Sequence, residues 1–483
     1  MTTPFVHLFQ TSENDYMYDV NMDQILKIPN FFYKALSADL SLVNASEQAK
    51  EYAMQLRSYG YLKADRVECV EHPATYLLPA LLEKKLTQAV LQVTQRCNLR
   101  CEYCIYSGNY ETRTHSQKDM PWEVAKKAMD YLISHSADNK AVTLSFYGGE
   151  PLLRFDLIKR CVLYMENHLE GKELIFNLTT NGTIMTPEIA DFMNQHRVGI
   201  MFSLDGPEKM HNQHRKFANS DKGSFHVLMN TLTYFETHFP EYAKQLHFNS
   251  VIDTERDYDV LSEFMNRDPH MRKYKFLINS IDDAYTENHR IASESYLQGS
   301  EYEYFQFLLS KAGRFSPKNV SKLAIQRYQE IPEKVIHNKD NRGTIGRCNH
   351  HGGPCIPGVR KIFINVDGDL FPCERISETS TITKLGHIDS GIDIKQAEAI
   401  LNIERQTHDM CKDCWAYRYC TSCVKAIDGI DHYNMKSQLV KCSSCKSSTE
   451  AIMKDYCVLR EAGYDFFEDK CGEIKPLSKE ASV

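Results

Sequence analysis

The chain has 483 residues, including 16 cysteines, and a formal net charge of −7 at pH 7. This acidic balance disfavours a nucleic-acid or anionic-membrane partner. The sequence has neither a signal-peptide pattern at its N-terminus nor an apolar run of roughly 18 residues that could span a membrane. We therefore expect a cytoplasmic protein of at least two domains, in which clustered cysteines are metal ligands rather than disulfides.

Residues 1–85 predict a small α/β module. The runs "FVHLFQ", "YMYDVN" and "QILKI" have strand character, and residues 30–38 and 46–62 have helical spacing.

Residues 86–345 predict an open (β/α) barrel followed by a helical bridge. Strand-like and amphipathic segments alternate, which is typical of a parallel sheet. The strand-like runs are 89–94, 141–148, 173–180, 198–204, 246–252 and 274–281. Six strands are fewer than the eight of a closed barrel. We therefore expect a partial (β/α)6 TIM-like barrel of the α/β class, with a helical segment at 296–340.

Polar and glycine-rich residues follow four of these strands. They are Cys97, "GGEP" at 148–151, "TNG" at 180–182 and "SLDGP" at 203–207. Because the carboxyl ends of parallel strands carry the active site in such folds, these four segments predict one shared site.

Cys97, Cys101 and Cys104 place three thiols in one short loop. Three thiolates can hold a [4Fe–4S] cluster and leave one iron open to an external molecule. The alternatives are a zinc knuckle or buried cysteines, but a three-cysteine zinc site generally needs a fourth protein ligand.

The C-x3-C-x2-C spacing, with Tyr103 before the third cysteine, resembles the radical S-adenosylmethionine (SAM) enzymes. The resemblance implies that SAM binds the open iron and is split to a 5′-deoxyadenosyl radical, which abstracts a hydrogen atom from substrate. It also implies SAM contacts from the backbone of Gly148, Gly149 and Ile105 and from the side chains of Glu150, Asn181, Ser203 and Arg215. Taken singly, Glu150, Asn181 and Ser203 could be ordinary turn or cap residues, and Arg215 could form a surface ion pair.

The C-terminal cysteines form a second array, and their C-x2-C pairs leave two zinc sites as an alternative. "KIFINVDGDLFPCER" predicts a hairpin that delivers Cys373. Residues 346–460 resemble the SPASM extension of radical SAM proteins, which implies two auxiliary [4Fe–4S] clusters, and 461–483 would be a tail. The implied ligands of the first cluster are Cys348, Cys355, Cys373 and Cys423. Those of the second are Cys411, Cys414, Cys420 and Cys442, with Cys445 as a competitor.

The spacing of Cys420 and Cys423, the residue after Cys373 and the remaining cysteines also bear on the proposed clusters. Only two residues separate Cys420 from Cys423, where the family pattern has three. Glu374 follows Cys373, where some SPASM enzymes place an acidic residue facing substrate; it could act as a base or be an ordinary ion-paired glutamate. The remaining cysteines, Cys69, Cys161, Cys457 and Cys471, are expected to lie outside the clusters.

The N-terminal module resembles the winged-helix leader-recognition domain of peptide-modifying radical SAM proteins; a structural cap is the alternative. The complete domain order resembles maturases of ribosomal cysteine-rich peptides, including the sactipeptide and ranthipeptide thioether enzymes. This implies three [4Fe–4S] clusters, SAM, a precursor peptide with a leader, and a flavodoxin- or ferredoxin-like electron donor. The alternative functions are a carbon–carbon crosslink, epimerisation, oxidation of a sulfatase residue, or a non-catalytic iron–sulfur or zinc scaffold that binds peptides.

Overall fold

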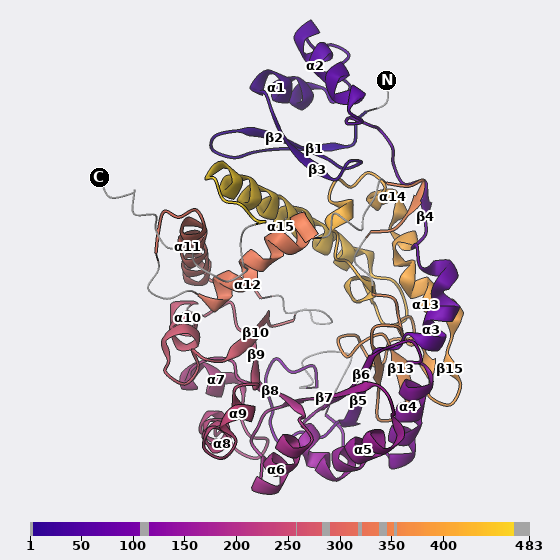
Figure 1. The fold of residues 1–483 in the computed structure, drawn as a ribbon, viewed down its shortest axis with the longest axis vertical. Helices are drawn as coiled ribbons and strands as arrows, with labels where there is room; N and C mark the ends of the chain where they lie inside the picture. The colour runs from indigo at the N-terminus through magenta and orange to yellow at the C-terminus, as the bar shows by residue number, and fades with distance from the viewer. Residues whose placement is uncertain are drawn as a thin grey trace.

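The computed structural model describes residues 3–106, 115–256, 258–282, 290–316, 321–337, 345–351 and 355–467. Figure 1 shows the N-terminal module at one end of the molecule and the large sheet with its helices at the other. Among the described helices, none combines the length and the apolar character needed to cross a membrane.

The N-terminal module is a three-stranded antiparallel sheet followed by two helices, as predicted. The strands are β1 (Val6–Gln10), β2 (Asp15–Asp19) and β3 (Gln24–Ile28), with β2 in the centre. Helix α1 (Asn30–Ala38) buries Phe32 and Leu36, and α2 (Glu47–Ser58) buries Leu56, in one core with Met17 of β2. The Ser46 side chain accepts a hydrogen bond from the Ala49 amide and so caps α2.

Six parallel strands form the centre of the fold, which confirms the predicted alternation. They are β5 (Gln88–Thr94), β6 (Ala141–Gly148), β7 (Glu173–Thr180), β8 (Gly199–Ser203), β9 (His247–Ile252) and β10 (Lys275–Ser280), each paired with the next. The helices between them are α4 (Trp122–Ser134), α5 (Phe155–His168), α6 (Pro187–Gln195), α7 (Glu208–His214), α8 (Phe225–His238), α9 (Pro240–Ala243) and α10 (Tyr258–Arg267). The sheet is open, because β10 lies at its edge and does not pair with β5.

The predicted helical bridge consists of α11 (Glu294–Lys311) and α12 (Lys322–Ile331), followed by a π-helical turn at Pro332–His337. The rest of the predicted segment, to residue 340, lies outside the described residues.

The predicted cysteine-delivering hairpin is also present. Strand β12 (Ile362–Ile364) pairs antiparallel with β13 (Asp369–Phe371). The same β12 pairs in parallel with β5, so the hairpin extends the barrel sheet, which continues through β14 (Gly386–His387) and β15 (Gly391–Ile392). The cysteine-rich region is therefore anchored to the strand that precedes Cys97.

The longest helix of the described chain, α15 (Met435–Glu461), was not predicted. It follows α13 (Ile394–Leu401) and the short α14 (His408–Cys411) and runs beneath the N-terminal sheet (Figure 1). The Tyr16 hydroxyl donates to Glu461 at 2.7 Å, and a ring nitrogen of His7 lies 3.0 Å from Glu450. These contacts hold β1 and β2 against α15, and β3 forms the edge of the small sheet opposite β1.

The segment that joins the N-terminal module to the barrel packs with the C-terminal half of the molecule. Strand β4 (Cys69–Val70) pairs in parallel with β11 (Cys348–Asn349). Helix α3 (Leu78–Lys84) buries Leu78 and Leu82 in the barrel core. Residues 1–85 therefore contribute to more than one hydrophobic core.

Candidate functional site

The three-cysteine loop follows β5 and folds back on itself. The Cys104 amide donates to the Cys101 carbonyl at 3.0 Å. Burial raises the pKa of Cys97 and of Cys101 to about 12, and the neighbouring thiols contribute to each rise. Because the three thiols lie close enough to influence one another, the loop fits a metal centre that would bind them as thiolates.

Gly148 and Gly149 pack directly against the start of this loop. A Cβ on Gly148 would lie 2.1 Å from the Thr94 carbonyl oxygen, and one on Gly149 would lie 2.1 Å from the Arg96 carbonyl oxygen. The Gly149 amide donates to Thr94 at 2.9 Å, and the Glu150 amide donates to Arg96 at 2.8 Å. The two glycines therefore allow a close backbone approach to the cysteine loop, and their contact with SAM stays a prediction.

Glu150 joins the ends of β6 and β7. Its carboxylate accepts from the Leu152 amide at 3.0 Å, the Thr180 hydroxyl at 2.7 Å and the Asn181 amide at 2.8 Å. Burial raises the pKa of Glu150, and these hydrogen bonds oppose the rise. Glu150 is thus a buried cap, and its contact with SAM stays a prediction.

The Asn181 side chain lies next to the cysteine loop. Its amide nitrogen donates to the Asn98 side-chain oxygen at 2.9 Å, while its own oxygen accepts from the Thr183 hydroxyl at 2.6 Å. Ser203 is buried at the end of β8, and Ile105 is half-buried beside Cys104. The strand ends therefore converge as predicted, and the SAM contacts of these residues stay predictions.

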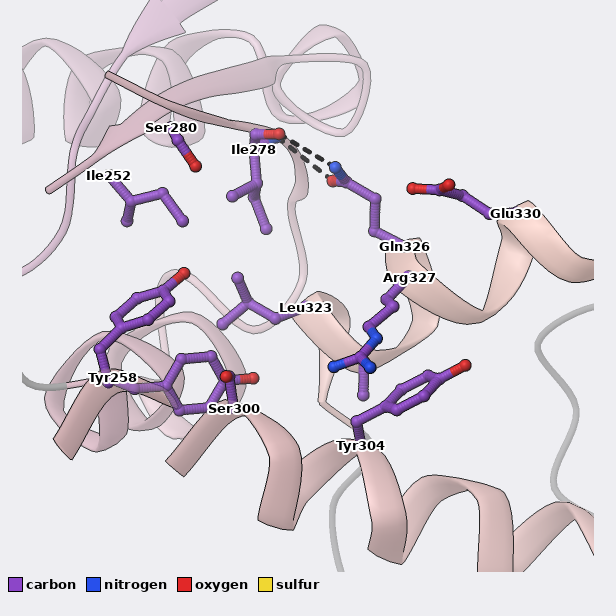
Figure 2. A pocket seen from close by; sticks show the side chains of 12 residues that line it. Ile252, Tyr258, Ile278, Ser280, Ser300, Tyr304, Leu323, Gln326, Arg327 and Glu330 are labelled. Atoms are coloured by element: carbon purple, nitrogen blue, oxygen red, sulfur yellow. Dashed lines mark hydrogen bonds between the residues drawn. The ribbon is translucent and has the colours of Figure 1, made fainter. Parts of the chain in front are cut away.

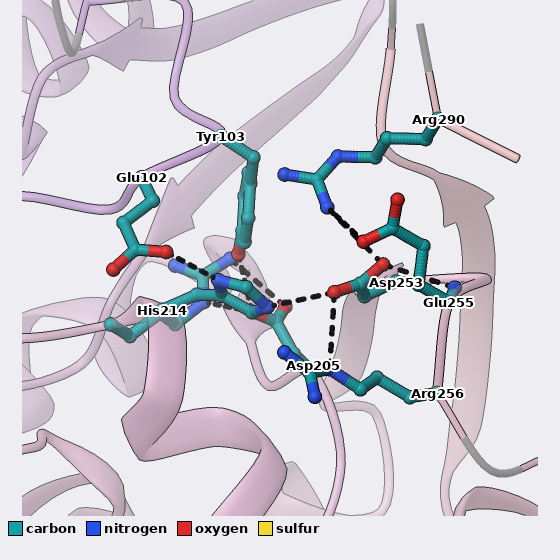
Figure 3. Close-up of polar contacts among 9 residues, drawn as sticks. Glu102, Tyr103, Asp205, His214, Asp253, Glu255, Arg256 and Arg290 are labelled. Atoms are coloured by element: carbon teal, nitrogen blue, oxygen red, sulfur yellow. Dashed lines mark hydrogen bonds and ion pairs between the residues drawn. The ribbon is translucent and has the colours of Figure 1, made fainter. Parts of the chain in front are cut away.

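Arg215 lies in the interior, so its alternative interpretation as a surface residue is wrong. Its Nε and Nη2 donate to the Asp205 carboxylate at 2.8 and 3.2 Å, and its Nη1 lies 3.9 Å from the Cys101 sulfur. The Tyr103 hydroxyl donates to the same carboxylate (Figure 3). Burial opposes ionisation of Asp205, but Arg215 holds its pKa below the usual range. Asp205 was not singled out from the sequence, although it stands in the quoted "SLDGP".

A second group of charges links the cysteine loop to the end of β9. The two ring nitrogens of His214 lie 3.0 Å from Glu102 and 3.2 Å from Asp253. Asp253 also receives contacts from Arg256 and Arg290 (Figure 3). These contacts hold the cysteine loop, α7 and the end of β9 together.

A separate cavity of about 220 Å³ lies between α15, which carries Cys442 and Cys445, and the preceding segment that carries Cys411, Cys414 and Cys420. It is lined by Cys411, Cys414, Cys420, Cys442 and Cys445, together with His351, Met410, Ala416, Tyr417, Leu439 and Lys446. Burial raises the pKa of Cys411 to about 12. Five thiols around one cavity fit a four-thiolate iron–sulfur centre, with Cys442 and Cys445 both placed to serve it.

The other predicted ligands fall into two groups. Cys423 is close enough to Cys373 to raise the pKa of its thiol, so these two thiols are neighbours. Cys348 lies opposite Cys69 in the β4–β11 pair, and the Cys69 thiol raises the pKa of Cys348. Cys355 is exposed. The proximity of Cys69 was missed because local sequence carries no signal for pairing with a strand so distant along the chain.

Two acidic residues follow Cys373. Glu374 forms an ion pair with Lys361, with its oxygens 3.1 and 3.2 Å from Nζ, and a role as base stays a prediction. Glu378 accepts from Gln92 at 2.7 Å and from Tyr106 at 2.9 Å. It therefore ties the cysteine-rich region to β5 and to the residues just after Cys104.

A further cavity, of about 280 Å³, lies beside edge strand β10 and is lined largely by tyrosines and by residues of α12. Gln326 of α12 donates to the Ile278 carbonyl at 2.9 Å and accepts from its amide at 3.3 Å (Figure 2). Gln326 thus occupies the backbone hydrogen-bonding groups of Ile278 at this edge. Another strand cannot pair with β10 at Ile278 without displacing the Gln326 side chain.

Comparison with known proteins identifies the central region. Residues 91–257 match the family model of the Radical SAM superfamily. The radical SAM cyclopropyl synthase TigE of Paramaledivibacter caminithermalis is 28% identical over 34% of this chain, and the chain spans only 34% of that protein's length. The cysteine-type anaerobic sulfatase-maturating enzyme of Clostridium perfringens (strain 13 / Type A) is 21% identical over 79% of this chain and 95% of its own.

A solved structure described as native anSMEcpe with bound AdoMet has the same fold. It aligns with a TM-score of 0.57 and 18% sequence identity, and the alignment covers 78% of this chain and 99% of the other. This likeness concerns the fold alone.

Proposed function

Because residues 91–257 form a radical SAM domain, we propose that this chain modifies a ribosomally made cysteine-rich peptide and forms a thioether between a cysteine sulfur and a carbon. One observation carries the proposal: the chain combines a three-thiol loop at the strand ends with a second cavity lined by five thiols. Thioether formation is a net oxidation, so it needs both a site that starts radical chemistry and an outlet for an electron.

The cysteine loop would start the radical chemistry. Cys97, Cys101 and Cys104 would hold a [4Fe–4S] cluster. When bound, that cluster would supply the electron that splits SAM to a 5′-deoxyadenosyl radical. The residues at the strand ends position this loop, and Gly148 and Gly149 leave no room for side chains next to it.

The cysteine-rich region would hold two auxiliary [4Fe–4S] clusters. The cavity set Cys411, Cys414 and Cys420, with Cys442 or Cys445, would hold one. Cys348, Cys355, Cys373 and Cys423 would hold the other, with Glu374 nearby as the proposed base. The pairing of β12 with β5 joins the two regions in one sheet, which would keep their clusters in a fixed relation to each other.

The proposed product can be tested by mass. Each thioether removes one hydrogen atom from carbon and one proton from the thiol, so the peptide should lose about two mass units per crosslink. The first candidate substrate is any short, cysteine-rich peptide that the neighbouring reading frame encodes, incubated without oxygen with SAM and a reductant. Mass spectrometry after alkylation should show one blocked cysteine per crosslink. An unchanged mass would indicate epimerisation, and a two-unit loss with every cysteine alkylated would indicate a carbon–carbon crosslink.

Similarity to the sulfatase-maturating enzyme supports a second candidate, oxidation of a residue in a sulfatase. A sulfatase peptide as the preferred substrate in the same assay would favour it. Iron–sulfur clusters without any SAM cleavage would instead favour a peptide-binding scaffold.

The N-terminal module supports a peptide partner with a leader. Strand β1 packs against α15, whereas β3 forms the other edge of the sheet and is largely unburied. An extended leader could add to this edge through backbone hydrogen bonds. A flavodoxin- or ferredoxin-like protein remains the proposed electron donor.

Deleting residues 1–62 should weaken precursor binding by at least about tenfold, because the leader contributes affinity rather than chemistry. The cut removes the core around Phe32 and leaves α3 in place, but it also removes Phe5, Phe9 and Tyr18 from the core that they share with α15, so iron content and SAM cleavage serve as the control for an intact fold. Binding is measured by fluorescence anisotropy of labelled precursor. Iron content and SAM cleavage should match the full chain, and equal precursor binding would assign the module a structural role.

A further inference from the structure

We propose that the buried ion pair of Asp205 and Arg215 sets the reduction potential of the cluster at the cysteine loop, with Arg215 raising the potential and the charge of Asp205 lowering it. The inference rests on the proposed function, because it takes Cys97, Cys101 and Cys104 as ligands of a [4Fe–4S] cluster.

Asp205 is buried, and four hydrogen bonds hold its carboxylate. Asp205 is 4% exposed and Arg215 is 7% exposed. Besides the two bonds from Arg215 and the one from Tyr103, the Val251 amide of β9 donates to Asp205 at 3.1 Å. One carboxylate thus joins the β8 loop, the residue after α7, strand β9 and the cysteine loop.

Arg215 reaches one of the proposed cluster ligands. Its Nη1 lies 3.9 Å from the Cys101 sulfur, and the centre of its guanidinium lies 5.5 Å from the Tyr103 ring centroid. A cation that donates to a cysteine sulfur stabilises the more negative, reduced form of an iron–sulfur centre. Arg215 should therefore raise the reduction potential of the one-electron couple.

Asp205 acts in the opposite direction. Its negative charge offsets that of Arg215 at a buried place where solvent screens little. If the ion pair only stabilised the fold, losing either partner would have the same consequence, an uncompensated buried charge. The two variants would then not shift the reduction potential in opposite directions. Opposite shifts in potential are therefore the signature of the proposed role.

The test is a redox titration of the full-length holoenzyme followed by electron paramagnetic resonance, using the signal that changes when SAM is added. The reductant is dithionite with redox mediators. Asp205→Asn should shift the midpoint potential upward, Arg215→Gln should shift it downward, and Asp205→Glu should stay close to the unmodified chain.

Glu236→Gln is the matched control. Glu236 also accepts from a tyrosine hydroxyl, Tyr274 at 2.6 Å, and pairs with a cation, Lys273 at 2.8 Å, but outside the cysteine loop. It should leave the potential unchanged.

The possible outcomes distinguish failure of this inference from failure of the proposed function. Shifts of the same sign in Asp205→Asn and Arg215→Gln, or no shift in either, would overturn the inference while the proposed function stands. If Asp205→Asn loses the cluster, the Arg215→Gln arm decides, and an unchanged potential there would refute the inference. An unmodified chain without any SAM-responsive signal would overturn the proposed function, and this inference with it.

Discussion

Replacing Cys97, Cys101 and Cys104 together by alanine should abolish reductive SAM cleavage. These thiols are the proposed ligands of the cluster that binds SAM, and a cluster without thiolate ligands is not retained. The variant should keep about eight iron atoms per chain, because two auxiliary clusters would hold about four each. The measurements are 5′-deoxyadenosine by liquid chromatography and iron and sulfide per chain.

Cys161→Ala is the control for this triple variant. Cys161 is fully buried in the barrel core, as expected for a cysteine outside the clusters, so its replacement tests cysteine loss alone. It should keep cleavage and the full iron content. Measurable 5′-deoxyadenosine from the triple variant would contradict the assignment of the loop.

Gly149→Ala should displace the cysteine loop and remove most SAM cleavage, by about a hundredfold or more, because even small misplacement of reacting groups is costly. The added Cβ would meet the Arg96 carbonyl oxygen at 2.1 Å and the Cys97 amide nitrogen at 3.1 Å, and backbone cannot yield as a flexible side chain can. Cleavage rates and the iron content of the variant measure the effect.

Gly171→Ala provides the comparison. A Cβ there meets nothing within 4 Å, although the positive φ of +72° costs some strain. It should keep nearly full activity. Unchanged cleavage by Gly149→Ala would mean that the tight contact with the loop is not needed for the chemistry.

The sequence predicted the elements whose patterns are local. Alternating strands and helices were recognisable from hydrophobic periodicity, and the hairpin ending before Cys373 from its turn and flanking apolar runs. The pairing of β12 with β5 was not predictable in this way, because it joins strands far apart in the chain. Helix α15 was missed since its many polar and cysteine residues give only a weak amphipathic pattern.

The same distinction applies to the site. Cysteine spacing identified the loop, and polar residues at strand ends identified the edge on which the site is built. The sequence did not indicate that Arg215 pairs with Asp205, or that Cys69 faces Cys348, because such contacts depend on how loops meet in three dimensions. Glu150 was recognised as part of the site, but its three hydrogen bonds to the strand ends could be seen only in the structure.

The most direct test of the account is hydrogen transfer from the peptide to SAM. A precursor built from deuterated amino acids is incubated with the enzyme, SAM and a reductant, and 5′-deoxyadenosine is analysed by mass spectrometry. If the radical formed beside the cysteine loop removes hydrogen from a peptide carbon, the 5′-deoxyadenosine should be about one mass unit heavier. Unlabelled 5′-deoxyadenosine, formed alongside crosslinked deuterated peptide, would contradict the account.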